Sequence, residues 1–104
     1  MVLPADNLIE EATKIYKVLS NSTRITILYY LRHQSGAVDV STIVSDLGLA
    51  QPVVSKQLGI LYRYQLVCKH KQGTRVYYLL DDPHVVEMID DMLNHVRHEI
   101  KGEP

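Results

Sequence analysis

The chain has 104 residues, a formal net charge of −1 and a single cysteine. This length suits one domain with one modest hydrophobic core, and we expect residues 1–104 to form it. No apolar run is long enough to cross a membrane, and the N-terminal MVLPADNL lacks the basic and apolar regions of a signal peptide. A lone cysteine forms no internal disulfide, so we expect a cytoplasmic protein with no membrane partner.

The small net charge hides a strong segregation of charge along the chain. Residues 47–80 contain no Asp or Glu but five Lys or Arg, whereas the residues after Leu80 include seven acids and only two Lys or Arg. A basic middle segment predicts an electrostatic surface for nucleic acid. On charge alone, a merely solvated surface remains the alternative.

Three helices are predicted in the first half of the chain. Apolar residues recur at helical spacing over residues 8–19, which predicts an amphipathic helix used for packing or for contact with a second copy. The cap-forming residues 20–22 separate it from a second helix that runs to about Gln34. Asp39 can cap a third, short helix that ends at Gly48.

Residues 39–67, DVSTIVSDLGLAQPVVSKQLGILYRYQLV, have the anatomy of a helix-turn-helix. A short helix is followed by a glycine-containing turn and by a second helix from about Gln51 to Tyr64. One face of this second helix is apolar and suits the core. The candidate DNA-reading residues lie on the opposite face near its N-terminus, with side chains suited to base edges and phosphates: Gln51, Pro52, Ser55 and Lys56.

Two strands, 66–71 and 75–80, follow and are joined by a turn that contains Gly73. A hairpin placed directly after a helix-turn-helix is typical of a winged helix. Three cations lie at or near its tip, where they would contact the phosphate backbone: Lys69, Lys71 and Arg75. A generic surface hairpin is the alternative. We expect His70 to add a backbone contact and Cys68 to be buried in packing.

The run from Asp81 to Glu99 predicts one long helix, which completes the order helix, helix, helix, helix, strand, strand, helix. The predicted fold class is therefore mostly α with a small β-hairpin (α+β), arranged as a winged helix-turn-helix. Asp82 supplies an N-cap carboxylate, and Pro83 occupies the first helical position. At about 100° per residue, three histidines fall within an arc of roughly 60° beside the apolar face. They are His84, His95 and His98.

The spacing of these histidines predicts a metal site shared by two chains. His84 precedes His95 by eleven residues, about 16 Å along a helix, so one helix cannot bring them together. Two antiparallel copies would place Asp82 and His84 of one chain beside His95 and His98 of the other. One carboxylate and three imidazoles suit tetrahedral Zn²⁺, with Co²⁺ second. The alternative is that Asp82 only caps the helix and the histidines are solvated.

The order of elements, together with LSNSTRITILYYL, LGLAQPVVSKQLGIL and KQGTRVYYLLDD, resembles the ArsR/SmtB family of metal-responsive repressors over nearly the full length. DDPH followed by HVRH resembles the interhelical zinc site of the zinc- and cobalt-sensing branch. The resemblance implies a homodimer formed through the N- and C-terminal helices. It also implies that the metal-free dimer binds a palindromic operator in double-stranded DNA, and that Zn(II) or Co(II) releases it and derepresses metal efflux genes.

The resemblance assigns four metal ligands: Asp82 and His84 from one protomer, and His95 and His98 from the other. It also places the backbone acceptor for a ligand histidine's outer N–H at about Gln65. Relatives that sense arsenic or lead carry a cysteine motif where this chain reads AVDVSTI, which excludes that route to soft metals. Relatives that prefer Ni(II) add histidines in their tails, whereas this chain ends EIKGEP.

Two alternatives stay open: a winged-helix regulator that ignores metal, and a nickel or cobalt sensor that uses the same four residues. An enzyme is not expected, because four protein ligands close the site and no nucleophile-base pair is evident. The pair Gln51-Pro52 departs from the small polar pair usual in the family, which leaves the operator sequence undefined.

Overall fold

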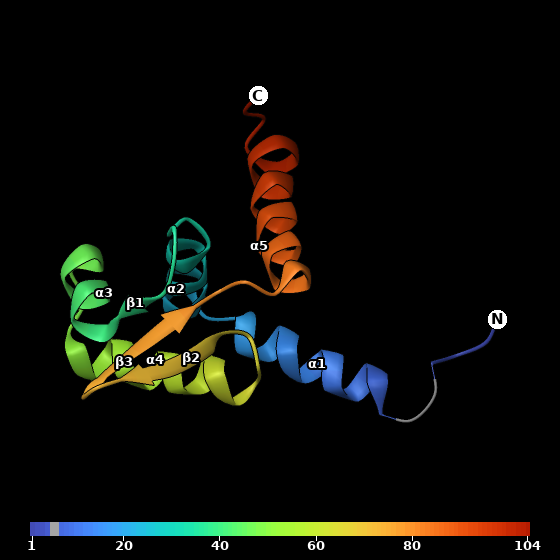
Figure 1. Cartoon of the computed structure of the whole chain (residues 1–104). Helices are drawn as coiled ribbons and strands as arrows, with labels where there is room; N and C mark the ends of the chain where they lie inside the picture. Colours follow the sequence, from blue (N-terminus) through green and yellow to red (C-terminus); the bar gives the residue numbers. More distant parts are fainter. Residues whose placement is uncertain (5–6) are drawn as a thin grey trace.

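The computed structural model describes residues 1–4 and 7–104. They form five α-helices and one three-stranded antiparallel sheet of order β1-β3-β2 (Figure 1). The elements in chain order are α1 (Leu8–Leu19), α2 (Ser22–Arg32), β1 (Val38–Asp39), α3 (Val40–Leu47), α4 (Gln51–Arg63), β2 (Cys68–Gln72), β3 (Arg75–Leu79), α5 (Pro83–His95) and a closing π-helical turn (Val96–Ile100). The predicted class, mostly α with a small β component, is confirmed.

Local capping signals place the helix ends within two residues of the predicted positions for α2, α3 and α4. The Asn21 side chain accepts a hydrogen bond of 2.9 Å from the Arg24 backbone N–H at the start of α2. Gly48 ends α3 with a φ of 65°, a left-handed conformation that glycine adopts without steric cost. These caps fix the start of α2 and the end of α3, two of the helices that form the core.

The predicted two-stranded hairpin is in fact a three-stranded sheet. β1 pairs with β3 in the register Val38↔Tyr78 and Asp39↔Tyr77, while β2 pairs along the other edge of β3. A two-residue strand is too short to show an alternating pattern, so the sequence carries no periodic signal for it. The additional strand ties the segment before α3 to the wing.

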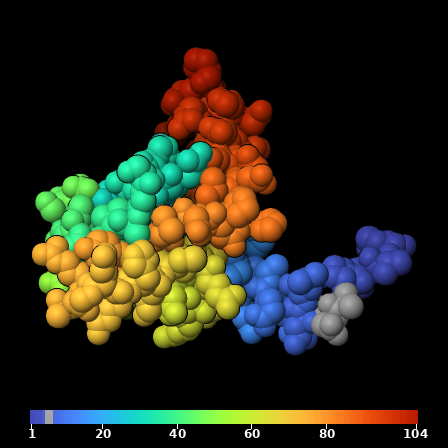
Figure 2. Space-filling view, in the orientation of Figure 1, coloured from blue at the N-terminus to red at the C-terminus, as the bar shows by residue number. Residues whose placement is uncertain are grey.

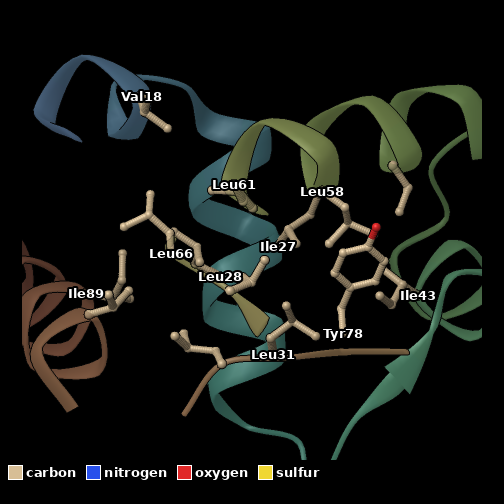
Figure 3. Packing of buried hydrophobic residues seen from close by; sticks show 14 residues of the cluster. Val18, Ile27, Leu28, Leu31, Ile43, Leu58, Leu61, Leu66, Tyr78 and Ile89 are labelled. Atoms are coloured by element: carbon tan, nitrogen blue, oxygen red, sulfur yellow. The ribbon is translucent and has the colours of Figure 1, made fainter. Parts of the chain in front are cut away.

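The core is built around α2, with α4 packed against it (Figure 3). Val85 and Ile89 of α5 cover one side of this cluster and are 5% exposed. The largest fully buried side chains all come from α2, α3 and α4: Ile27, Leu28, Leu31, Ile43, Val54, Leu58 and Leu61. Close packing on this scale makes the helix-turn-helix a rigid base for whatever α4 presents to solvent.

The helices α1 and α5 project from this body in different directions (Figures 1 and 2). The Cα radius of gyration is 15.3 Å, whereas a compact domain of this length has about 13 Å. On α1, Leu8, Ile9 and Tyr16 are 63%, 57% and 63% exposed. Exposed apolar side chains on projecting helices indicate a surface that packs against another chain.

Within residues 1–4 and 7–104, no helix combines the length and the apolar character needed to cross a membrane.

The chain leaves α4 through a left-handed residue that is not glycine. Gln65 has a φ of 60°. Its N–H donates to the Tyr62 carbonyl at 3.0 Å, and the Leu66 N–H donates to the Leu61 carbonyl at 2.9 Å. These are the two hydrogen bonds of a Schellman motif, whose left-handed position usually holds glycine. Gln65 therefore stores backbone strain at the junction between α4 and β2.

Relief of this strain gives a first prediction. Gln65→Gly is expected to raise the free energy of unfolding by about 1 kcal/mol, because glycine occupies the left-handed region without a Cβ clash. Urea unfolding with an unchanged m-value measures the gain. Gln72→Gly is the control, since Gln72 lies in an exposed strand without positive φ and glycine there should destabilise. Equal destabilisation by both changes would contradict the strain at Gln65.

Candidate functional site

The exposed face of α4 carries the four predicted DNA-reading residues. Its other face is held in the core by Val54, Leu58 and Leu61, which are 0% exposed. Because α4 is fixed along this buried row, the opposite side of the helix faces solvent. The structure places all four on the exposed side of the first two turns: Gln51, Pro52, Ser55 and Lys56.

Arg24 holds α4 in place through contacts that were not predicted from the sequence. Its Nε donates to the Val18 carbonyl at 2.6 Å, and its Nη1 donates to Gln57 Oε1 at 2.7 Å. Val18 lies in the last turn of α1 and Gln57 lies on α4, so one guanidinium on α2 joins three helices. Helical periodicity carries no signal for such a link, because Arg24 is one of several polar residues in α2.

The wing divides its three cations between two faces of the sheet. Side chains of residues directly opposite each other in adjacent strands point to the same face. Lys69↔Tyr78 and Lys71↔Val76 therefore share one face, and Gln72↔Arg75 lies on the other. The three cations of the wing therefore do not all lie on one face of the sheet.

The two faces place these cations in different surroundings. Lys69 Nζ lies 4.2 Å from the centre of the Tyr62 ring on α4, which puts its charge beside the exposed face of that helix. Arg75 Nη1 instead lies 3.1 Å from Asp39 Oδ2, so an acid of β1 partly neutralises its charge. Lys69 and Lys71 are thus the wing cations best placed for a polyanion bound along α4.

The N-terminus of α5 brings two of the predicted metal ligands together. Asp82 Oδ1 accepts a hydrogen bond of 2.8 Å from the His84 backbone N–H, which confirms Asp82 as the N-cap. The same oxygen lies 3.3 Å from His84 Nδ1. Ligand atoms about 2.0 Å from a tetrahedral zinc ion are separated by about 3.3 Å. The two side chains are therefore spaced as neighbouring ligands of one such ion, and both are open to solvent.

The other two predicted ligands lie far from this pair within one protomer. His95 ends α5 and His98 lies in the π-helical turn that follows, one helix length away from His84. Among the described residues of a single chain, no three His, Cys, Asp or Glu side chains form a group that could hold a metal ion. Within one protomer, only Asp82 and His84 of the four predicted ligands lie close together.

The end of the helix differs from the prediction of one regular α-helix to Glu99. The Lys101 N–H donates to the Val96 carbonyl at 3.0 Å, a bond five residues back that widens this turn. The predicted arc assumed about 100° per residue throughout. Because His98 lies in this wider turn, its direction relative to His84 and His95 differs from the one predicted for a regular α-helix. Turns of this kind are frequent at functional sites.

The two sides of α5 have different partners. One side packs on the core through Val85 and Ile89, and Arg32 of α2 binds the Asp90 carboxylate through three contacts of 2.9–3.2 Å. The hydrogen bonds from Arg32 lower the pKa of Asp90, and the same bonds raise the pKa of Arg32. This pair fixes the rotation of α5 about its axis. The other side leaves Met92 58% exposed.

An apolar groove of about 240 Å³ lies between α1 and this exposed side of α5. Its lining residues are almost entirely apolar: Tyr16, Leu19, Ser20, Ile25, Met88, Ile89, Met92 and Leu93. Of these, only Ile89 is buried within the protomer, at 5% exposure. The groove and the exposed side chains of α1 make one continuous surface suited to a second protein chain.

Cys68 is exposed, so the prediction that it is buried was wrong. The register places it opposite Leu79 on the outer face of the sheet, where its Sγ lies 3.5 Å from Asp81 Oδ1. Partial desolvation and the neighbouring Asp81 carboxylate raise the pKa of the thiol. The protonated thiol is a poor nucleophile and a poor metal ligand.

Comparison with known proteins explains this arrangement of elements. Residues 21–69 match the family model described as bacterial regulatory protein, arsR family. The matched segment runs from the N-cap of α2 through α4 into β2, which is the whole helix-turn-helix. The chain is 33% identical over 86 residues to the uncharacterised HTH-type transcriptional regulator MJ1325 of Methanocaldococcus jannaschii, covering 80% of this chain and 96% of that protein.

The chain belongs to the ArsR family of transcriptional regulators.

Two further similar proteins carry a metal or metalloid in their names. The cadmium resistance transcriptional regulatory protein CadC homolog of Staphylococcus aureus is 30% identical over 84% of this chain and 71% of its own length. The crystal structure of the AntR antimony-specific transcriptional repressor superposes with a TM-score of 0.81 at 26% identity, covering 97% of this chain and 90% of AntR. The metals in these names are properties of those proteins.

The fold of the ArsR-family chain is also that of a known dimer. A homodimeric winged helix-turn-helix domain, Mb0332 of Mycobacterium bovis, superposes with a TM-score of 0.82 at 24% identity, covering 99% of this chain and 96% of that one. This likeness confirms the predicted winged helix-turn-helix. The chain is therefore a DNA-binding transcriptional regulator, and its matched relatives are regulators rather than enzymes.

Proposed function

We propose that this ArsR-family protein is a homodimeric repressor controlled by Zn(II) or Co(II). The metal-free dimer binds a palindromic operator in double-stranded DNA. Metal bound between the two α5 helices releases the DNA and derepresses genes for metal efflux or resistance. The observation that carries the proposal is the pair Asp82 Oδ1 and His84 Nδ1, 3.3 Å apart at one end of α5, with His95 and His98 at the other end.

The exposed apolar surface of α1 and α5 supports the dimer. Antiparallel pairing of two α5 helices through the side that carries Met88 and Met92 would bury this surface. It would also bring Asp82 and His84 of each chain to the distal histidines of its partner. A twofold axis makes two identical sites, each with one carboxylate oxygen and three imidazole nitrogens. This donor set suits four-coordinate Zn(II) or Co(II), whereas octahedral Ni(II) would need further ligands.

The position of the proposed ligands supports coupling to DNA binding. A hollow beside the N-terminus of α5 is lined by Gln65–Cys68, which follow α4, and by Asp81–His84. A change in the position of α5 would therefore act on the segment that leaves the recognition helix. A ligand histidine that donates its outer N–H to the backbone near Gln65 would complete this connection. Metal can release DNA only by binding the low-affinity arrangement of the dimer more tightly.

On the DNA side, α4 lies in the major groove in this proposal. Gln51, Pro52, Ser55 and Lys56 contact base edges and adjacent phosphates, and the wing contacts the backbone. Arg75 contributes less than the two lysines of the wing, because it is paired with Asp39 at 3.1 Å. Residues 47–80 contain no Asp or Glu that would repel the DNA backbone from α4 and the wing.

The wing gives a second prediction. Lys71→Ala is expected to weaken binding to all duplexes and to reduce the slope of log K against log salt by about 0.9, the loss of one phosphate contact. Arg75→Ala, with its charge already paired, is expected to change the slope by less. Fluorescence anisotropy at several salt concentrations measures both variants. A slope reduction for Arg75→Ala as large as that for Lys71→Ala would contradict this ranking.

The proposed function is tested with a duplex that the wild-type protein enriches from a random-sequence pool. Zn(II) is titrated into the metal-free protein on this duplex while anisotropy reports DNA binding. Saturation at one ion per protomer, with the dissociation constant for DNA raised by about tenfold or more, is expected from typical coupling energies. Bound zinc with unchanged DNA affinity would instead favour a regulator that ignores metal.

A further inference from the structure

We infer that Gly59 is the point of closest approach between α4 and the DNA backbone, so that the recognition surface continues past Lys56. The inference rests on the proposed role of α4 in DNA binding and extends it to a residue that has no side chain. Gly59 lies in the interior of α4 and is exposed. Glycine is the poorest helix former apart from proline, so its presence in a helix interior requires a reason.

The fold supplies no such reason. The glycines with positive φ are Gly48, Gly73 and Gly102, so Gly59 does not serve a left-handed conformation. A Cβ built on Gly59 would meet no atom within 4 Å. Neither the backbone geometry nor the packing within the protomer therefore prevents alanine or a larger residue at this position.

The neighbours of Gly59 on α4 define the surface on which the absence of a side chain matters. Residues three and four apart are adjacent on the surface of a helix. Ser55 and Lys56 precede Gly59 at this spacing, and Tyr62 and Arg63 follow it; all four are exposed. Gly59 is thus the centre of the exposed row of α4, on the side of the helix turned away from the buried row. It forms a gap between the proposed base-reading residues and the Tyr62 ring.

The chemistry around this gap identifies its occupant as nucleic acid. Lys56 and Arg63 lie on either side of it, and Lys69 Nζ of the wing sits 4.2 Å from the Tyr62 ring at its far end. Because Gly59 has no side chain, a phosphodiester strand can approach the helix backbone there closely. Its phosphates then lie within short range of the surrounding cations. A side chain at residue 59 would hold the strand away from all of them.

The experiment compares Gly59→Ala and Gly59→Leu with Gly36→Ala on the wild-type-enriched duplex. Gly36 is also exposed with nothing within 4 Å of a built Cβ, but it lies in the loop after α2. Both Gly59 variants are expected to melt at or above the wild-type temperature, since each improves helix propensity. The DNA dissociation constant should rise about tenfold or more for Gly59→Leu, as for a lost specific contact, and by less for Gly59→Ala. Gly36→Ala should change neither the melting temperature nor the DNA dissociation constant.

Wild-type DNA affinity in Gly59→Leu would overturn the inference while leaving the proposed function intact. Gly59→Ala decides the same question if the leucine variant is unstable, because alanine adds only the Cβ for which space is present. Lower melting temperatures for both variants would also overturn it, by showing that the fold itself needs glycine. A wild-type protein that enriches no duplex would overturn the proposed function and the inference together.

Discussion

His98→Ala is expected to abolish the release of DNA by zinc while the metal-free protein keeps its affinity for DNA. His98 lies in the π-helical turn after α5, beyond the elements that hold α4 in the core. Its loss removes one of the four proposed ligands. Loss of even an outer-shell partner lowers metal affinity by about 10–100-fold. Removal of a ligand should therefore lower zinc affinity by more than about 100-fold.

Two titrations on each variant measure this result: zinc binding by calorimetry and DNA binding by anisotropy with and without zinc. His33→Ala is the matched control, because His33 is an exposed histidine at the end of α2 whose Nδ1 lies 2.9 Å from the Tyr29 carbonyl oxygen. It should keep both zinc binding and release. A metal-free His98→Ala protein with weakened DNA binding would contradict the separation between the sensing end of α5 and the DNA-binding surface.

Leu58→Ala is expected to cost about 3 kcal/mol of folding free energy, a large part of the roughly 5–15 kcal/mol that a small domain has. The Leu58 side chain is 0% exposed and holds α4 against the core formed with α2. Its truncation leaves a cavity under the recognition helix, since the surrounding helices relax only in part. DNA affinity should fall as well, because α4 loses its fixed orientation.

Urea unfolding measures the cost, with Val53→Ala as the control on the same helix. Val53 is 40% exposed, so its truncation is expected to change stability by less than about 0.5 kcal/mol. Similar losses for the two variants would show that the buried row of α4 is not what anchors the helix. A large loss for Leu58→Ala alone supports the rigid base inferred from the core.

The recognition helix could be predicted from sequence because its signals are local. Gly48 ends the preceding helix, and an apolar row with the period of a helix runs from Val54 to Leu61. The predicted span of residues 51–64 differs from the observed Gln51–Arg63 by one residue. Capping and periodicity depend only on residues close together in the chain, so both can be recognised without the rest of the fold.

The features that were missed depend on contacts between distant residues. β1 exists because Val38 and Asp39 pair with β3, forty residues later in the chain. The exposure of Cys68 and the separation of Arg75 from the two lysines follow from the strand register, which the sequence of a hairpin does not determine alone. A preference of cysteine for burial is a statistical tendency, and the register overrode it.

The candidate metal site could be predicted in part for the same reason. Asp82 and His84 are neighbours in the chain, and a capped helix start brings them within 3.3 Å. The direction of His98 depends on a π-turn that the regular helical spacing did not predict. The complete site depends on a second copy of the chain, so the ligand set of four residues remains a prediction.

The most direct test of the central claim mixes two inactive variants. His84→Ala and His98→Ala are each expected to lose the intense absorption of tetrahedral Co(II), since each change damages both sites of a homodimer. The two are then unfolded together and refolded. If each site takes Asp82 and His84 from one chain and His95 and His98 from the other, a mixed dimer has one intact site. About one quarter of the wild-type absorption should return, because about half of the dimers are mixed. A mixture that stays without tetrahedral absorption would contradict a metal site shared between protomers.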